Sequence, residues 1–199
     1  ARAAFVAMAA PTKFEDALER APALCAALQA GETPDGLEDF VLSSAGARGF
    51  FVHYLTGDEW TCADDGVPPA LSSSLEAASA ATIEIMLMNI VMSTATAEAH
   101  RRAGREEQAS QSARTGARAR ILVAGMWEHL PALRDSFGAL SEAVQSEFLV
   151  EAPPAPVAVD EWVKFLARWS YDEEQLQLVA DALAQVPPVS NEASEPRQQ

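Results

Sequence analysis

The strongest constraint on the fold is the run TIEIMLMNIVM at residues 82–92, which is apolar on nearly every side of a helix. A surface helix carries one apolar face, whereas a helix that is apolar all round is buried among other elements. We therefore expect a buried central helix over about 76–97. A helix that crosses a membrane needs about 20 consecutive apolar residues. This run is shorter and contains Glu84 and Asn89, so we expect no transmembrane span.

The rest of the chain also favours helices. Alanine, the strongest helix former, is the commonest residue, and no strand pattern longer than a few residues occurs. Apolar residues recur at helical spacing instead, which predicts an all-α fold, a bundle of about six or seven helices. The expected helices cover 12–30, 35–55, 69–103, 105–130, 131–150, 160–170 and 172–185, with an acidic loop at 57–69.

Individual residues set the expected helix ends. Thr12 is followed three residues later by Glu15, which is the capping-box spacing, and Gly31 follows the first helix. Gly104 follows three basic residues, an arrangement typical of a helix C-terminus. The helical segments on either side of Gly104 therefore predict a long antiparallel hairpin over 69–130.

The composition divides the chain into five parts. A helical bundle over 12–150 is followed by a Pro-rich linker at 151–159. A pair of helices at 160–186 then packs on the bundle or docks from it. Residues 187–199 have the composition of a disordered tail. We expect residues 1–11 to be a processed N-terminal extension.

The N-terminal segment ARAAFVAMAAPTKF is rich in alanine and contains no acidic residue. It resembles the tail of an organelle transit peptide. Ala4 and Phe5 are similar to the Phe-centred signal of the secondary plastids of red-lineage algae. The resemblance implies an organelle, a plastid such as a chloroplast, with a complex of the photosynthetic machinery as the host. Without it, we expect a soluble intracellular protein.

Residues 100–120, here called the Arg island, hold six of the twelve arginines in a chain whose formal net charge is −15. Two pairs, Arg101 with Arg105 and Arg114 with Arg118, are spaced i,i+4 and share a helix face. Such a face can hold phosphate, a carboxylate-rich partner or an anionic lipid headgroup. We expect an anionic partner to dock through Arg101, Arg102, Arg105, Arg114, Arg118 and Arg120. The alternative is a solvated face on which the arginines balance nearby acids, and such pairs contribute about 0–1 kcal/mol each.

Glu84 and Asn89 lie inside the apolar run, where a carboxylate must find a partner or take up a proton. We expect Glu84 to be buried and paired with an arginine from the facing arm of the hairpin. The alternative is a pocket in the bundle interior around Glu84 and Asn89, which binds a small molecule or pigment, or carries out a reaction.

Trp162, Phe165 and Trp169 cluster on one side of the helix that follows the Pro-rich linker. Tryptophan and arginine are the residues that most often anchor interfaces. We therefore predict that Trp162 and Trp169 contact a partner. The alternative is that this helix folds back on the bundle.

The chain carries no motif of nucleotide-binding, zinc-protease or serine-hydrolase chemistry, and its three histidines lack metal-ligand spacing. We therefore expect no cofactor and no metal. We also expect free thiols at Cys25 and Cys62, with one disulfide between them as the alternative. The acidic balance excludes non-specific nucleic-acid binding, because such a surface repels polyanions. These patterns predict a non-catalytic interaction protein rather than an enzyme. It is a subunit or assembly factor that binds a protein partner, which can belong to a membrane-associated complex.

Overall fold

The computed structural model describes residues 10–149 and 155–186, and all regular secondary structure in these ranges is helical. The all-α prediction is therefore confirmed. Three predicted parts lie wholly or partly outside the described residues. They are residues 1–9 of the N-terminal extension, the first half of the linker, and the tail at 187–199.

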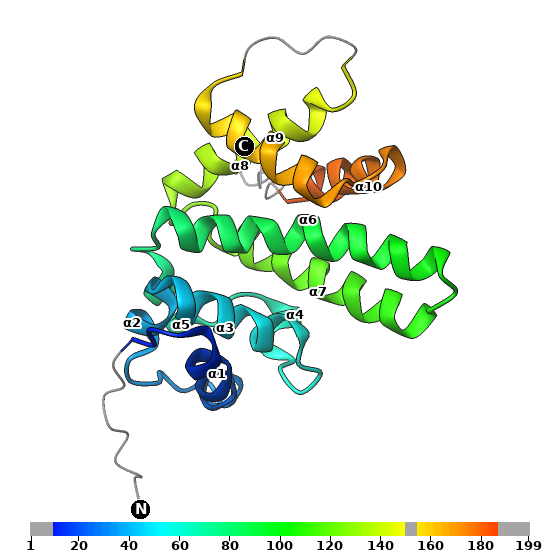
Figure 1. Cartoon of the computed structure of the whole chain (residues 1–199). Helices are drawn as coiled ribbons and strands as arrows, with labels where there is room; N and C mark the ends of the chain where they lie inside the picture. The colour runs from blue at the N-terminus through cyan, green and yellow to red at the C-terminus, as the bar shows by residue number, and fades with distance from the viewer. Residues whose placement is uncertain (1–9, 150–154, 187–199) are drawn as a thin grey trace, which may run out of the picture.

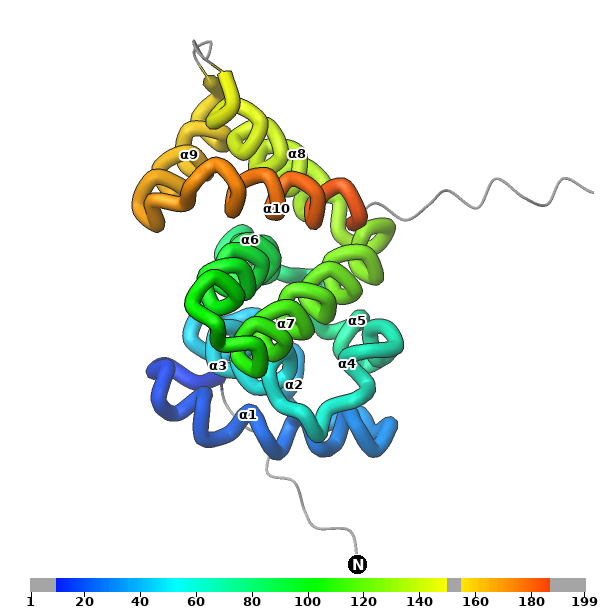
Figure 2. Tube along the Cα trace, turned by 90° about the vertical axis from the view of Figure 1, so that its right-hand side faces the viewer, coloured from blue at the N-terminus to red at the C-terminus, as the bar shows by residue number. Residues whose placement is uncertain are grey.

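The helices form three layers, which Figures 1 and 2 show from two directions. The N-terminal layer comprises α1 (Phe14–Gln29), α2 (Leu37–Leu42), α3 (Ser44–Thr56), α4 (Cys62–Asp65) and α5 (Pro69–Leu75). The middle layer is a hairpin of α6 (Ala80–Arg102) and α7 (Glu106–Gly125). The C-terminal layer comprises α8 (Pro131–Ser146), α9 (Val157–Trp169) and α10 (Glu173–Ala184).

Helix α6 is the central helix that the apolar run predicts. It packs against α7 and α3 on one side and against α8 and α10 on the other. By length and composition α6 is also able to cross a membrane, a test that the core helix of a soluble protein passes as well. The expectation of no transmembrane span stays a prediction.

The prediction of a single helix over 69–103 is wrong, because α5 and α6 are separate. The break comes at Ser79, whose extended backbone ends the preceding turn and whose Oγ accepts a hydrogen bond from Thr82 N at 3.3 Å. The Thr82 hydroxyl in turn donates to Val41 O at 3.2 Å. These two bonds fix the start of α6 against α2.

The hairpin of α6 and α7 turns at Gly104, as expected. Its φ of 68° lies in the left-handed region, where glycine carries no steric penalty. The next residue, Arg105, donates its N–H to His100 O at 2.9 Å, which caps the end of α6. Helix α7 then runs to Gly125, several residues short of the expected end.

Two details of the N-terminal layer differ from the prediction. Thr12 does not cap α1, because the N-cap residue is Lys13 and no side chain caps it. The helix expected over 35–55 is divided by Ser43, whose extended backbone separates α2 from α3 and whose Oγ accepts from Gly46 N. A short helix, α4, also lies within the predicted loop.

The C-terminal layer packs on the hairpin, chiefly through α10 against α6 (Figure 2). Helix α10 begins at a capping box in which Asp172 and Gln175 bond to each other's backbone N–H groups. The Gln175 side chain also donates to Ala95 O of α6 at 3.0 Å. Helix α9 begins at Val157, so Asp160 lies in its first turn and does not cap it, contrary to expectation.

Candidate partner-binding groove

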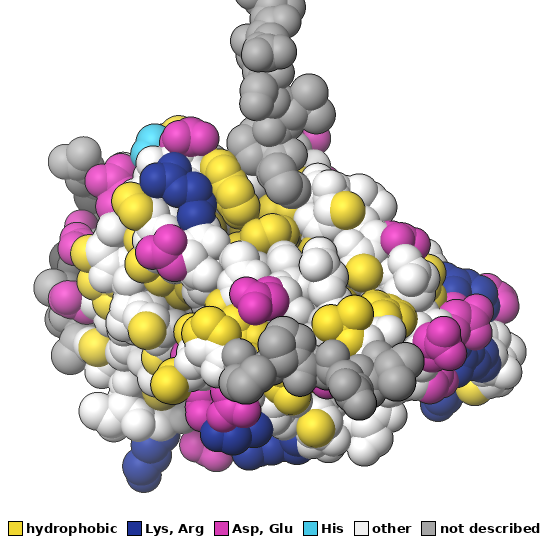
Figure 3. All heavy atoms as spheres, turned by 90° about the horizontal axis from the view of Figure 1, so that it is seen from above, with side chains coloured by type: hydrophobic (Ala, Val, Ile, Leu, Met, Phe, Trp, Pro, Cys, Tyr) yellow, Lys and Arg dark blue, Asp and Glu magenta, His cyan; other side chains and the backbone are white. Residues whose placement is uncertain are grey.

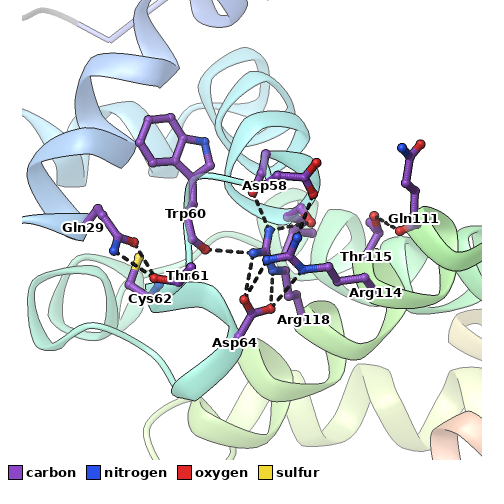
Figure 4. A network of polar contacts seen from close by, with 12 residues as sticks. Gln29, Asp58, Trp60, Thr61, Cys62, Asp64, Gln111, Arg114, Thr115 and Arg118 are labelled. Atoms are coloured by element: carbon purple, nitrogen blue, oxygen red, sulfur yellow. Dashed lines mark hydrogen bonds and ion pairs between the residues drawn. The ribbon is translucent and has the colours of Figure 1, made fainter. Parts of the chain in front are cut away.

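The arginines of the Arg island do not all lie free on the surface, and Arg118 is the clearest example. This side chain is 1% exposed, although it was predicted to contact a partner. Its guanidinium donates to both carboxylate oxygens of Asp64, at 2.7 and 3.0 Å (Figure 4). It also donates to the backbone carbonyls of Gly57 at 2.8 Å, Trp60 at 2.9 Å and Leu55 at 3.3 Å. The prediction for Arg118 is wrong, because the α3–α4 loop closes over it.

Arg114 lies one turn earlier on the same face of α7, as its spacing predicts. It binds Asp58 at 2.7 Å and Asp64 at 2.8 Å (Figure 4). Hydrogen bonds from Arg118 and Arg114 hold the pKa of the Asp64 carboxyl well below its usual range. The predicted acidic loop is therefore a clamp, in which carboxylates and carbonyls tie α7 to the N-terminal layer.

The arginines at the tip of the hairpin are also paired within the chain. Glu98, which is only 5% exposed, accepts from both Arg101 and Arg102. Arg102 reaches further and binds Asp172 and Glu174 at the start of α10. The hydrogen bonds that Arg102 donates to Asp172 and Glu98 raise the pKa of Arg102, and the bonds to Asp172 lower the pKa of that carboxyl to about 2.

Of the remaining two arginines in the Arg island, Arg105 is exposed and Arg120 is half-buried. Desolvation alone lowers the pKa of Arg120. In Figure 3, basic and acidic side chains lie intermingled at the hairpin tip, on the right of the view. Most of the positive charge that predicted an anionic partner is thus neutralised by acids of the same chain.

Glu84 is not buried, contrary to the prediction. Its side chain is exposed, and among the described residues it forms no ion pair with any arginine. Asn89 is half-buried and donates through Nδ2 to Ile85 O of its own helix at 2.7 Å. The buried carboxylate of α6 is instead that of Glu98, near the tip of the hairpin.

Glu84 instead lines a groove between α6, α8 and α9, which we call the acidic groove. It has a volume of about 400 Å³, within the range of small-ligand pockets. Asn89 is not among its lining residues, so only one of the two residues of the predicted pocket, Glu84, lines it. The lining residues are Glu84 and Met88 from α6, Asp135 and Ser136 from α8, and Ala158, Glu161, Trp162 and Phe165 from α9.

The acidic groove has an apolar floor and an acidic rim. The floor contains Trp162, which is 7% exposed and meets Phe165 edge-on with 5.6 Å between the ring centroids. The rim carries the exposed carboxylates of Glu84, Asp135 and Glu161. Figure 3 shows the molecule from above, with hydrophobic and acidic side chains side by side over the C-terminal layer.

The rim carboxylates differ in their partners. Glu161 binds Lys164 at 2.8 Å on its own helix. Within residues 10–149 and 155–186, neither Glu84 nor Asp135 forms an ion pair or a side-chain hydrogen bond. The acidic groove thus presents two uncompensated negative charges above an apolar surface, an arrangement suited to a ligand that combines a cation with an apolar group.

A family model described as uncharacterised conserved protein UCP020893 matches residues 13–186. This chain belongs to that family. The matched range extends from the N-cap of α1 to just beyond α10, so it includes all three layers and the acidic groove. No match was found among curated proteins or among solved structures.

The two tryptophans predicted to contact a partner differ in burial. Trp162 folds back into the core and forms the groove floor, whereas Trp169 is 48% exposed at the end of α9. Sequence reasoning missed Met88, Asp135 and Glu161, because they lie on three helices and only the packing of α8 and α9 over α6 brings them together.

The described residues contain no group of three or more His, Cys, Asp or Glu side chains able to hold a metal ion. Cys25 and Cys62 are free thiols, as predicted. Cys25 is buried, and this burial raises the pKa of its thiol to about 12.

Proposed function

We propose that this chain is a non-catalytic interaction protein, a subunit or assembly factor of a larger complex, that binds a protein partner in the acidic groove. One observation carries the proposal: Glu84 and Asp135 form a rim without internal counter-charges above an aromatic floor. Unpaired charge beside apolar surface is what a partner can complete, while charge already paired within the chain is not. The acidic groove therefore replaces the Arg island as the docking site in our proposal.

The groove floor supports binding rather than catalysis. Trp162, Phe165 and Met88 provide large apolar contacts, and aromatic side chains dominate the binding energy of many interfaces. Methionine adapts its shape to different partners. The rim carboxylates supply orientation and specificity, which is the usual role of charges at an interface.

A substitution that fills the acidic groove tests this proposal. Ala158 lies exposed on the groove wall, so Ala158→Trp should occupy the groove without disturbing the core. The matched control is Ala167→Trp, an exposed position of the same helix outside the groove. We expect native partners to co-purify with the parent and with the control, but not with Ala158→Trp. Equal recovery with both variants would place docking elsewhere.

The cellular location belongs to this proposal as well. The residues that precede α1 resemble a plastid-targeting segment. We therefore propose an organelle, a plastid, as the location and a photosynthetic complex as the host. Fractionation of cells that express the tagged chain tests it. Recovery in the cytosol would remove the plastid from the proposal and leave the acidic groove unaffected.

A second candidate function is the binding of a small organic molecule or pigment in the same groove. Its volume of about 400 Å³ and its aromatic floor favour this reading. Native mass spectrometry of the purified chain tests it. A bound organic molecule that Ala158→Trp displaces would support the small-molecule function over the protein partner.

A further inference from the structure

We infer that the segment bound in the acidic groove is a basic amphipathic helix of the partner protein. The inference rests on the proposed function and adds the chemistry of the partner. It follows from three properties of the groove: the charge of its rim, the shape of its floor and the helices that form its walls.

The rim selects for positive charge from three sides. Glu84, Asp135 and Glu161 each come from a different helix and surround the same opening. Lys164, which pairs with Glu161, also binds Asp160 at 2.8 Å, so it already has its own counter-charges. A formal net charge of −15 adds long-range attraction for a basic partner and repulsion of nucleic acid and anionic lipid.

The size of the acidic groove limits which part of a partner can enter it. A volume of about 400 Å³ holds one or two large side chains and excludes a folded domain. An apolar side chain of the partner would contact Trp162 and Phe165. A neighbouring lysine or arginine would then reach Glu84 or Asp135, and its cation can also lie against the indole of Trp162.

The helices that form the walls of the acidic groove favour a helical partner segment. All three walls of the acidic groove are α-helices, whose backbone N–H and C=O groups are satisfied internally. They offer no open strand edge to which an extended peptide could add. A helix satisfies its own backbone and needs no such edge, so it suits these walls better than an extended strand does. On a helix, apolar and basic residues three or four positions apart lie side by side.

The direct test uses a fluorescein-labelled peptide of 18 residues (about five turns) in which leucines form one helix face and lysines the other. Binding to the full chain is followed by fluorescence anisotropy. A second peptide carries glutamate in place of every lysine and keeps the leucine face. We expect the lysine peptide to bind and the glutamate peptide to fail.

General attraction of a basic peptide to an acidic protein is controlled by two double variants. Glu84→Gln with Asp135→Asn removes the unpaired rim charges. Glu32→Gln with Asp35→Asn removes the same charge from two exposed residues of the loop between α1 and α2. We expect the rim variant to weaken peptide binding by about tenfold, since two surface pairs are lost, and the control to bind as the parent does.

The outcomes separate this inference from the proposed function. Equal affinity of the two double variants, or equal binding of the two peptides, would overturn the basic helix. The proposed function would then still be decided by Ala158→Trp and the native partner. Loss of the native partner in that variant, with no preference for the lysine peptide, would mean that the acidic groove binds a partner of different chemistry.

Discussion

Two clusters of carboxylates in this protein have opposite surroundings. In the clamp, Asp64 receives hydrogen bonds from Arg118 and Arg114 and ties α7 to the N-terminal layer. In the acidic groove, Glu84 and Asp135 have no cation among the described residues. An acidic or basic sequence pattern therefore does not by itself mark a binding surface. What marks one is charge that the fold leaves unpaired.

Arg118→Leu should destabilise the protein more than any other single substitution considered for the clamp. Removal of the guanidinium takes a charged donor from the carbonyls of Gly57 and Trp60 and leaves Asp64 without its closest cation. We expect the free energy of unfolding to fall by about 3 kcal/mol, measured by urea denaturation. Arg114→Leu, one turn away and partly exposed, should cost less than about 1 kcal/mol. Similar losses in the two variants would contradict the distinction between buried and surface arginines.

The next comparison uses two glutamates of the same helix. Glu98→Gln removes a buried carboxylate that binds Arg101 and Arg102, and should destabilise the protein by about 1–2 kcal/mol. Glu84→Gln removes an exposed, unpaired charge and should change stability by less than about 0.5 kcal/mol. Thermal unfolding of both variants decides this. A large loss at Glu84 would mean that the groove carboxylate has a structural role.

Because of the clamp, we also expect the stability of the folded state to fall in acid. Hydrogen bonds from Arg118 and Arg114 lower the pKa of Asp64 below its ordinary value of 3.8, so the folded state favours the ionised carboxylate. Its contribution to stability is therefore present above about pH 4 and is lost as the pH falls further. Urea midpoints at pH 6 and pH 3 should differ less for Arg118→Leu than for the parent. An unchanged difference would show that other carboxyls cause the acid response.

The smallest expected effect concerns the two thiols. Burial raises the pKa of Cys25 from 9.0 to about 12, so the folded state keeps this proton when the unfolded chain has lost it. Stability from Cys25 is complete below about pH 9 and falls as the pH rises toward 12. Iodoacetamide should modify Cys62, which is partly exposed, well before Cys25. Equal rates would show that the N-terminal layer opens readily.

The parts of the fold that depend on local pattern were predictable. The all-round apolar run identified α6 as the central helix, and Gly104 with its basic neighbours identified the hairpin turn. The break at Ser79 was missed, because a serine inside a helical pattern caps a new helix only where its backbone is extended. Helix periodicity alone does not distinguish these two conformations.

The candidate site was less predictable, because it depends on contacts between distant segments. Glu84 and Glu98 lie on the same helix, but Glu98 is buried, while Glu84 lines a groove that α8 and α9 form with α6. Arg118 finds its acceptors 54 to 63 residues earlier in the chain. No pattern within a single helix reports such distances.

The clamp around Arg118 has a consequence for synthesis on the ribosome. The carbonyl of Leu55 is made 63 residues before the guanidinium that binds it. At typical elongation rates this interval lasts about 3–13 s. During that time the loop after α3 lacks the side chain that ties it to α7. The clamp can therefore form only after α7 leaves the exit tunnel, on a segment that is already made.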